Sequence, residues 1–278
     1  MQNRITKFTL ILSIIFSGVI ANAQAPIDGF YPGKNNGAIA VSGSFESYDE
    51  FFLGDGSEAN WADDYNTNTI GIYGTYGITD KFAVAVSVPY IMINTMNFND
   101  EEVNRKGIQD LGLYAKYKVI NAQIGNLNLS VSPALGFSTP LSNYVVDFYG
   151  IGQHATAVDL RAIVMATFNN GLFAEAQGAG LVRFDPAPSG SQFNFKAGYF
   201  NSKFYGDVFY AIQSIHGGED LPNPSDFKAL GVSYSKAGIT LAYNIFDMLG
   251  IYVGGAVVLD GENVGKSTRY NGGVVVRW

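Results

Sequence analysis

The last nine residues of the chain, 270–278, alternate between two kinds of side chain. One face is apolar and ends on an aromatic residue at the final position: Tyr270, Gly272, Val274, Val276 and Trp278. The other face carries Arg269, Asn271, Gly273, Val275 and Arg277. Successive side chains of a β-strand point to opposite faces of the sheet, so this pattern predicts a strand with two different environments. A chain built from such strands needs a fold that supplies both.

The same alternation recurs along most of the chain. It predicts strands at 37–46, 66–78, 82–90, 110–119, 127–138, 158–168, 172–183, 193–199, 204–213, 227–246 and 251–259, before the last strand. Within 227–246 the apolar phase changes between Tyr234 and Ile239. This change predicts either one strand with a bulge near Ala237–Gly238 or two strands split by a tight turn. No stretch after the first two dozen residues approaches the ~20 apolar residues of a transmembrane helix.

The connections between these strands alternate in length. Short turns are predicted near residues 80, 123, 170, 202 and 248, and the triplet Asn169-Asn170-Gly171 is a strong hairpin signal. Long loops are predicted near residues 56, 100, 148, 187, 220 and 263. If the short turns lie at one end of a barrel, both termini lie there too, which requires an even number of strands. This parity favours one bulged strand at 227–246 and twelve strands in total.

The final strand resembles the closing strand of bacterial outer-membrane β-barrels. The insertion signal of that family is polar-x-Gly-x-x-apolar-x-aromatic, and the chain supplies Asn271, Gly273, Val276 and Trp278 at those places. We therefore predict an all-β fold, a closed antiparallel transmembrane β-barrel of about twelve strands with short periplasmic turns and longer outer loops. Closure is required because lipid offers no partners for an open sheet edge. A soluble β-sandwich or adhesin would alternate too, but needs neither such long strands nor the terminal signal.

The amino terminus predicts a secretory signal peptide over residues 1–23. Arg4 and Lys7 precede a short apolar core at 8–20, and Ala21-Asn22-Ala23 is a cleavage site of the A-x-A type. Residues 24–36 are then either a disordered lead-in or a small plug, and 37–278 form the barrel. Cleavage would change the net charge from −7 to −9, so binding to nucleic acid is not expected. The chain has no cysteine, which excludes lipidation at a cysteine, disulfides and thiolate metal sites.

Charged residues occupy the polar face of the predicted strands. They are expected to point into the lumen because a charge facing lipid costs up to ~2–4 kcal/mol. They are Glu46, Asp110, Lys116, Lys118, Asp159, Arg161, Glu175, Arg183, Lys196, Asp207, Arg269 and Arg277. The simpler interpretation is that opposite charges pair and fill the lumen, with Asp159 diagonal to Arg183. The alternative is a polar constriction that selects solutes.

The predicted outer loops carry unusual aromatic residues. We expect them either to form an apolar entrance or to pack on one another and cover the mouth of the barrel. They are Phe51, Phe52, Trp61, Tyr144, Phe148 and Tyr149. The two histidines, His154 and His216, also lie in predicted loops, and no His-centred motif of a membrane lipase is present. No catalytic site, metal or cofactor is therefore predicted.

Three segments resemble the transporter-type outer-membrane barrels grouped with the MetA pathway of phenol degradation. They are 77–90 (GITDKFAVAVSVPY), 107–118 (GIQDLGLYAKYK) and 259–264 (LDGENV). The resemblance is diffuse but covers most of the chain after residue 23. It implies an outer-membrane channel for passive uptake of small hydrophobic or aromatic compounds. Its expected partners are outer-membrane lipid, the barrel-assembly machinery and an unidentified solute. The alternative is a structural or adhesive barrel that presents its loops.

Overall fold

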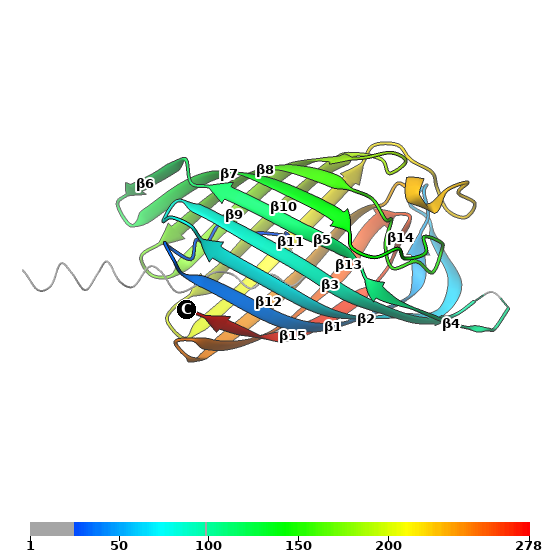
Figure 1. Ribbon diagram of the computed structural model, residues 1–278, viewed down its shortest axis with the longest axis horizontal. Helices are drawn as coiled ribbons and strands as arrows, with labels where there is room; N and C mark the ends of the chain where they lie inside the picture. Colours follow the sequence, from blue (N-terminus) through cyan, green and yellow to red (C-terminus); the bar gives the residue numbers. More distant parts are fainter. Residues whose placement is uncertain (1–24, 98) are drawn as a thin grey trace, which may run out of the picture.

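The computed structural model describes residues 25–97 and 99–278, without the side chains of 61–64. It shows a closed antiparallel β-barrel with strongly tilted strands (Figure 1). The predicted signal peptide, residues 1–23, lies outside the described residues. No helix in the described part of the chain is long and apolar enough to cross a membrane.

Twelve strands form the ring, and three short strands extend it. The twelve are β1 (Gly37–Phe52), β2 (Glu58–Gly77), β3 (Phe82–Met96), β5 (Asp110–Tyr117), β7 (Leu127–Pro140), β8 (Ala157–Phe168), β9 (Leu172–Arg183), β10 (Gly190–Phe200), β11 (Phe204–Ile215), β12 (Ser233–Phe246), β13 (Leu249–Glu262) and β15 (Thr268–Arg277). The short strands are β4 (Glu102–Ile108), β6 (Ile120–Ile124) and β14 (Val264–Gly265). β1 closes the ring because it pairs with both β2 and β15. The predicted strand count and closure are confirmed.

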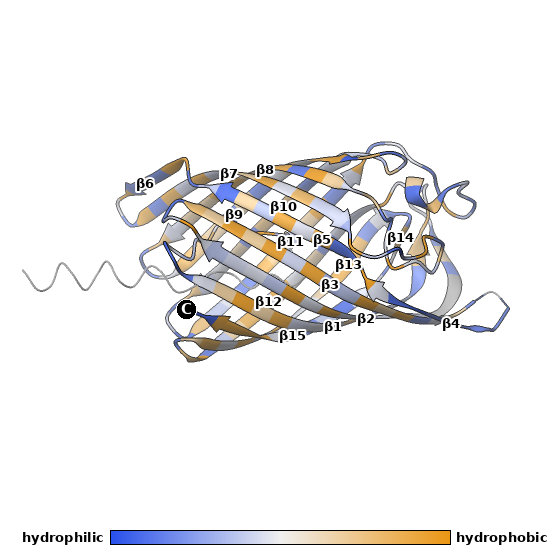
Figure 2. Ribbon diagram, in the orientation of Figure 1, coloured by the Kyte–Doolittle hydropathy of each residue, from blue (hydrophilic) through white to orange (hydrophobic). Residues whose placement is uncertain are grey.

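Hydrophobic and hydrophilic residues alternate along the strands of the ring (Figure 2), and large apolar side chains are exposed on its outer surface. Exposed side chains with a large apolar surface include Ile39, Val41, Ile72, Leu160, Val164, Phe195, Val208, Leu241, Val253, Val274 and Trp278. Between them, along the same strands, lie inward residues such as Ala38, Ala40, Gln177, Thr240 and Asn244, which are buried. This is the alternation expected of a barrel whose outer face meets lipid.

The segment 227–246 contains one strand, as the parity argument required, but the predicted bulge near Ala237–Gly238 is wrong. β12 begins only at Ser233, after a short 3₁₀ helix, Phe227–Ala229. The register against β13 shifts between Ser235 and Lys236, where the extra residue, Leu259, belongs to β13. The phase change in the sequence has another cause: Val232 and Tyr234 are apolar but line the interior.

Two predicted outer loops are wrong in extent because the strands continue beyond the predicted strand ends. β1 and β2 run to Phe52 and from Glu58, so the connection shrinks to residues 53–57. β3 and β4 pair as far as Met96 and Glu102, and this hairpin projects from one end of the barrel (Figure 1). Strand ends beyond the apolar belt do not face lipid, so apolar and polar residues need not alternate there. The sequence pattern that identifies a membrane strand is then lost.

Pro89 marks a break in the pairing of β3. β3 pairs with β5 up to Ser87 and with β4 from Tyr90 onward. Proline lacks the N–H group that a ladder requires, so the break falls where the donor is missing. The carbonyl oxygen of Pro89 still accepts a hydrogen bond from the Gln109 N–H at 3.0 Å. The register between β2 and β3 continues unshifted through Gly71–Pro89, so the break is confined to the other side of β3.

Candidate functional site

The chain enters the barrel at the end that carries the short turns and Trp278, which we call the turn end; the opposite end is the loop end. There the backbone N–H of Asn35 donates to the Gly77 oxygen at 2.8 Å. The Gly37 N–H donates to the Trp278 oxygen at 3.1 Å, and the Lys34 N–H to Asp80 Oδ1 at 2.9 Å. From this rim, residues 25–32 turn back into the lumen, and we call them the lumen segment.

Barrel side chains hydrogen-bond the backbone of the lumen segment. The Gly29 N–H donates to Glu175 Oε2 at 2.6 Å, and Gln177 Nε2 donates to the Ile27 oxygen at 2.8 Å. Lys116 Nζ donates to the carbonyl oxygens of Asp28 and Phe30 and lies 3.4 Å from Asp28 Oδ1. A buried segment outside the sheet has no ladder to satisfy its polar groups, so these side chains replace one.

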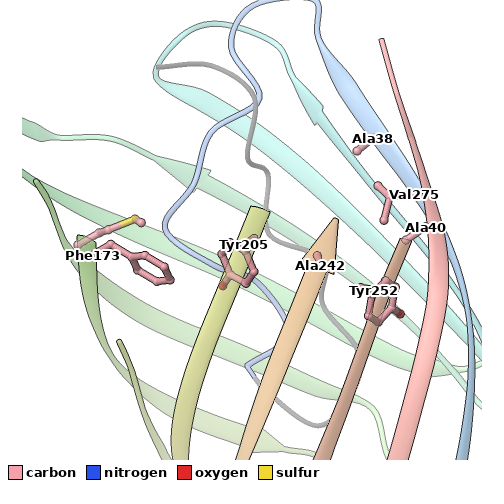
Figure 3. Packing of buried hydrophobic residues seen from close by; sticks show 8 residues of the cluster. Ala38, Ala40, Phe173, Tyr205, Ala242, Tyr252 and Val275 are labelled. Atoms are coloured by element: carbon pink, nitrogen blue, oxygen red, sulfur yellow. The ribbon is translucent and has the colours of Figure 1, made fainter. Parts of the chain in front are cut away.

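Apolar contacts hold the same segment. The Phe30 ring lies 5.3 Å from Phe173, 5.4 Å from Phe200 and 6.2 Å from Tyr205, measured between centroids. Figure 3 shows the buried cluster against which Phe30 packs, with Phe173, Tyr205 and Tyr252 on separate strands. Further along the segment, Ile27 packs with Ala85, Ala134 and Ile163. The lumen segment and these rings fill the lumen toward the turn end.

A cavity of about 440 Å³ lies beside Pro26, toward the loop end. Its wall comes from many strands and mixes charged, amide, aromatic and small residues: Gln109, Asp110, Tyr114, Ser138, Asp159, Leu181, Arg183, Gln192, Asn194, Ala211, Gln213, Val232, Tyr234 and Lys236, with Gly152, Gln153, Ala155 and Ala157 beside them. The volume is in the range of small-molecule sites.

A buried polar network joins the cavity to the lumen segment. Arg161 holds Asp159 through two bonds, Nη2–Oδ2 at 2.6 Å and Nε–Oδ1 at 3.2 Å. It also donates to Gln177 Oε1 at 2.8 Å and to Gln192 Oε1 at 2.9 Å. Gln177 is the residue that holds the Ile27 oxygen. A continuous chain of hydrogen bonds therefore runs from the wall of the cavity through Arg161 and Gln177 to the lumen segment.

Residues 141–156, which we call the cover loop, lie over the cavity. Tyr144 donates its hydroxyl to Asp110 Oδ1 at 2.7 Å and accepts from the His154 N–H at 2.9 Å. Burial, followed by the bond to Asp110, raises the pKa of Tyr144, so its hydroxyl stays protonated as a donor. Gln153 ties the loop down by donating to the Leu230 oxygen at 2.7 Å and accepting from Arg183 Nη1 at 3.0 Å.

The aromatic residues expected at the mouth mostly pack against one another. Phe51 is buried and lies 5.3 Å from Phe148, whose ring lies 5.1 Å from Tyr149. Phe52 is also buried, and the Tyr144 ring lies 4.9 Å from His154. The side chain of Trp61 lies outside the described residues. This packing is the second of the two arrangements considered for these residues, a covering of the mouth.

The structure places all twelve charged residues of the polar faces in buried or half-buried positions. The residues of this set that are not described above contact other side chains inside the barrel. Arg269 Nη1 lies 3.7 Å from Glu46 Oε2, and Arg277 Nη1 donates to Asn244 at 3.0 Å. Lys196 lies opposite Glu175 in the register, while Asp207 accepts from the Tyr205 hydroxyl. Lys118 Nζ lies 4.4 Å from the centre of the Tyr31 ring.

One predicted ion pair is different, and two interior residues were not predicted. Asp159 pairs with Arg161 and not with Arg183, although the diagonal register of Asp159 and Arg183 is as expected. Lys236 was missed because the misplaced bulge obscured its phase, yet it shares the even-numbered face of Thr240 and Ala242. Asp28 was missed because no periodicity marks an irregular segment.

The predicted insertion signal lies on the closing strand, β15. Asn271 and Gly273 face inward, whereas Val276 and Trp278 lie exposed on the outer face. β15 pairs with β1 and β13 across the seam of the ring. The Trp278 ring covers Gly37, where a Cβ would lie 2.5 Å from a ring atom.

The histidines show no catalytic arrangement in the described part of the chain. The His154 ring meets Tyr144 edge-on, and His216 uses its backbone N–H to bond the Ser189 oxygen. Neither ring is hydrogen-bonded to a serine or a carboxylate among the described side chains. Within the same residues, no group of three or more His, Asp or Glu side chains converges as a metal site would.

Comparison with known proteins shows the fold alone. No family model and no curated protein matches the chain. Among solved structures, the COG4313 outer membrane channel from Pseudomonas putida F1 is 14% identical, with a TM-score of 0.72, over 94% of this chain and 100% of that one. The NanC porin is 11% identical, with a TM-score of 0.51, over 86% of this chain and 98% of that one. The chain therefore has the fold of outer-membrane barrels.

Proposed function

We propose that the protein is an outer-membrane channel for passive uptake of small solutes. One observation carries the proposal: a closed barrel holds a cavity of about 440 Å³, and beside it residues 25–32 lie inside the lumen, where hydrogen bonds and packing hold them. The likeness to an outer membrane channel over the whole ring supports it. The resemblance to the MetA group favours hydrophobic or aromatic solutes.

In this proposal the lumen segment is a displaceable plug. The barrel donates or accepts about one hydrogen bond at each of Ile27, Asp28, Gly29, Phe30 and Tyr31, each worth about 0.5–1.5 kcal/mol net. These bonds and the Phe30 pocket favour the closed state, yet no covalent bond enforces it. Local opening of such a segment is within the range of native-state fluctuations.

Export and insertion complete the proposal. Residues 1–23 would direct the chain across the inner membrane, and the strand ending at Trp278 would engage the barrel-assembly machinery. A barrel that serves only structure or adhesion is not favoured, since the two similar structures named above are a channel and a porin.

A liposome-swelling assay tests the channel. The chain beginning at residue 24 is reconstituted and challenged with small neutral solutes such as benzyl alcohol and with sugars of increasing size. The proposal predicts swelling for the small solutes, with a steep size cut-off. Swelling no faster than that of protein-free liposomes for every solute would contradict it, provided that circular dichroism shows a folded barrel.

A further inference from the structure

We infer that the cavity is a binding site for a small organic carboxylate, with Arg183 and Lys236 as its cationic anchors. The inference rests on the proposed function, because the carboxylate would be cargo on its way through the barrel. It predicts that the solute is negatively charged, whereas the fold alone predicts no charge for the solute.

Both cations in the wall lack an acidic partner among the described residues. Among the described residues, the Arg183 guanidinium donates to the neutral amide of Gln153, through Nη1 at 3.0 Å, and to no carboxylate. Lys236 has its Nζ 4.7 Å from the centre of the Tyr234 ring and forms no ion pair in the described part of the chain. Such cations normally sit beside a carboxylate when they are withdrawn from water.

The two acids of the same cavity are already engaged. Asp159 is held by both ends of the Arg161 fork. Asp110 accepts the Tyr144 hydroxyl at 2.7 Å and lies near enough to Arg183 to attract it, without forming an ion pair. The two cations and the two acids of the wall balance in formal charge, but Arg161, which is not part of the wall, already neutralises Asp159, so one positive charge is left in excess around the cavity.

The remaining wall suits the body of a small organic acid. Tyr114 and Tyr234 offer ring faces or edges, while Leu181 and Val232 add apolar surface. Asn194, Gln192 and Gln213 supply amides from the neighbouring strands β10 and β11. An Arg guanidinium can bind a carboxylate through two parallel bonds, and a Lys ammonium adds a point charge. A neutral solute of the same shape would leave both cations unpaired.

The expected discrimination follows from charge-assisted hydrogen bonds. Each is worth about 1.5–3 kcal/mol, which corresponds to about a ten- to hundred-fold change in affinity. A carboxylate should therefore bind at least about ten-fold more tightly than its neutral amide. Removing both cations should abolish that preference.

The test compares benzoate with benzamide, which share a ring and differ in charge. Binding to the detergent-solubilised chain from residue 24 is measured by isothermal titration calorimetry for the wild type, Arg183→Gln, Lys236→Gln and the double variant. The inference predicts tighter binding of benzoate, a partial loss in each single variant and no preference in the double variant. Arg183→Lys should retain part of the preference because it keeps the charge but loses the fork.

Lys203→Gln is the matched control, since Lys203 lies exposed in a turn at the turn end and its loss changes the net charge equally. It should leave benzoate binding unchanged. Equal binding of benzoate and benzamide, no binding of either by a folded chain, or a preference that survives in the double variant would each overturn the inference.

Swelling measurements separate this inference from the proposed function. Liposome swelling with benzyl alcohol but no preference for benzoate in calorimetry would leave the channel standing and overturn the carboxylate site. Benzoate binding that depends on Arg183 and Lys236, without swelling for any solute, would support the site and contradict the channel.

Discussion

Replacing Phe30 with alanine should open the barrel. The ring lies between Phe173, Phe200 and Tyr205, at centroid distances of 5.3, 5.4 and 6.2 Å. Truncating a buried phenylalanine costs about 3–5 kcal/mol, and Phe30 is only half-buried, so about 2–3 kcal/mol is a reasonable loss. Since 1.4 kcal/mol is a factor of ten, the open population of the lumen segment should rise about 30- to 150-fold.

Single-channel recording in planar lipid bilayers measures this change as an increase in open probability. The barrel itself should stay folded, because Phe30 belongs to no strand. Phe193→Ala is the matched control: it is the same substitution on the exposed outer face of β10, and it should leave the open probability unaltered. If Phe30→Ala gates like the wild type while circular dichroism shows an intact barrel, the lumen segment does not control the path.

Two further substitutions test the contacts of the lumen segment, and a change of pH tests a bond in the loop that holds Glu219. Gly29→Ala should also increase opening, because its Cβ would lie 2.7 Å from Met165 Sδ and 2.9 Å from Glu175 Oε2; Gly43→Ala, with nothing within 4 Å, should not, and equal currents would refute the close approach. Lys116→Met removes the donor to two carbonyl oxygens and leaves Asp28 buried without its cation, so a loss of about 3–5 kcal/mol should appear as greater proteolysis of the lumen segment. The Ser225 hydroxyl lowers the pKa of Glu219, so this bond orders the loop at neutral pH and is lost as the pH falls below the ordinary value of 4.5. The protection factor of the Ser225 amide, which is its exchange rate relative to an unstructured chain at the same pH, should then fall, and a protection factor that stays the same would contradict the assignment.

The barrel could be predicted because its side chains alternate between the lipid and the lumen along each strand. Lipid forces apolar side chains outward at every second position, as at Val274 and Val276, and parity fixes the strand count. Where this alternation ends, so does the prediction: β1 and β2 continue to Phe52 and from Glu58, and β3 continues to Met96, beyond the strand ends that the alternation predicts. Val232 and Tyr234 misled the analysis because apolar side chains also line the cavity.

The candidate site was predicted as a set of residues but not as a set of contacts. Charge on the polar face identified Lys116, Arg161 and Glu175. Their partners depend on an irregular segment, in which Asp28 and Gly29 meet the wall by tertiary packing alone. Neutral side chains such as Gln177 carry no sequence signal of their role, because an amide on an inward face is as ordinary as a serine.

A reversible disulfide tests the central claim that displacement of the lumen segment opens the barrel. A Cβ on Gly29 would lie 3.0 Å from the Met165 Cβ, about 0.5 Å short of the Cβ–Cβ range of a disulfide, so a small shift of the segment would bring the two atoms into that range. The chain has no cysteine of its own. The variant Gly29→Cys with Met165→Cys should therefore lock the segment to β8 when oxidised.

Solute flux through this double variant is measured before and after reduction, with disulfide formation verified by mass spectrometry. If displacement of the lumen segment opens the barrel, flux should fall to the protein-free background when the disulfide is formed and rise at least to the wild-type level when it is reduced. Equal flux in the two states would show that the segment does not gate the barrel.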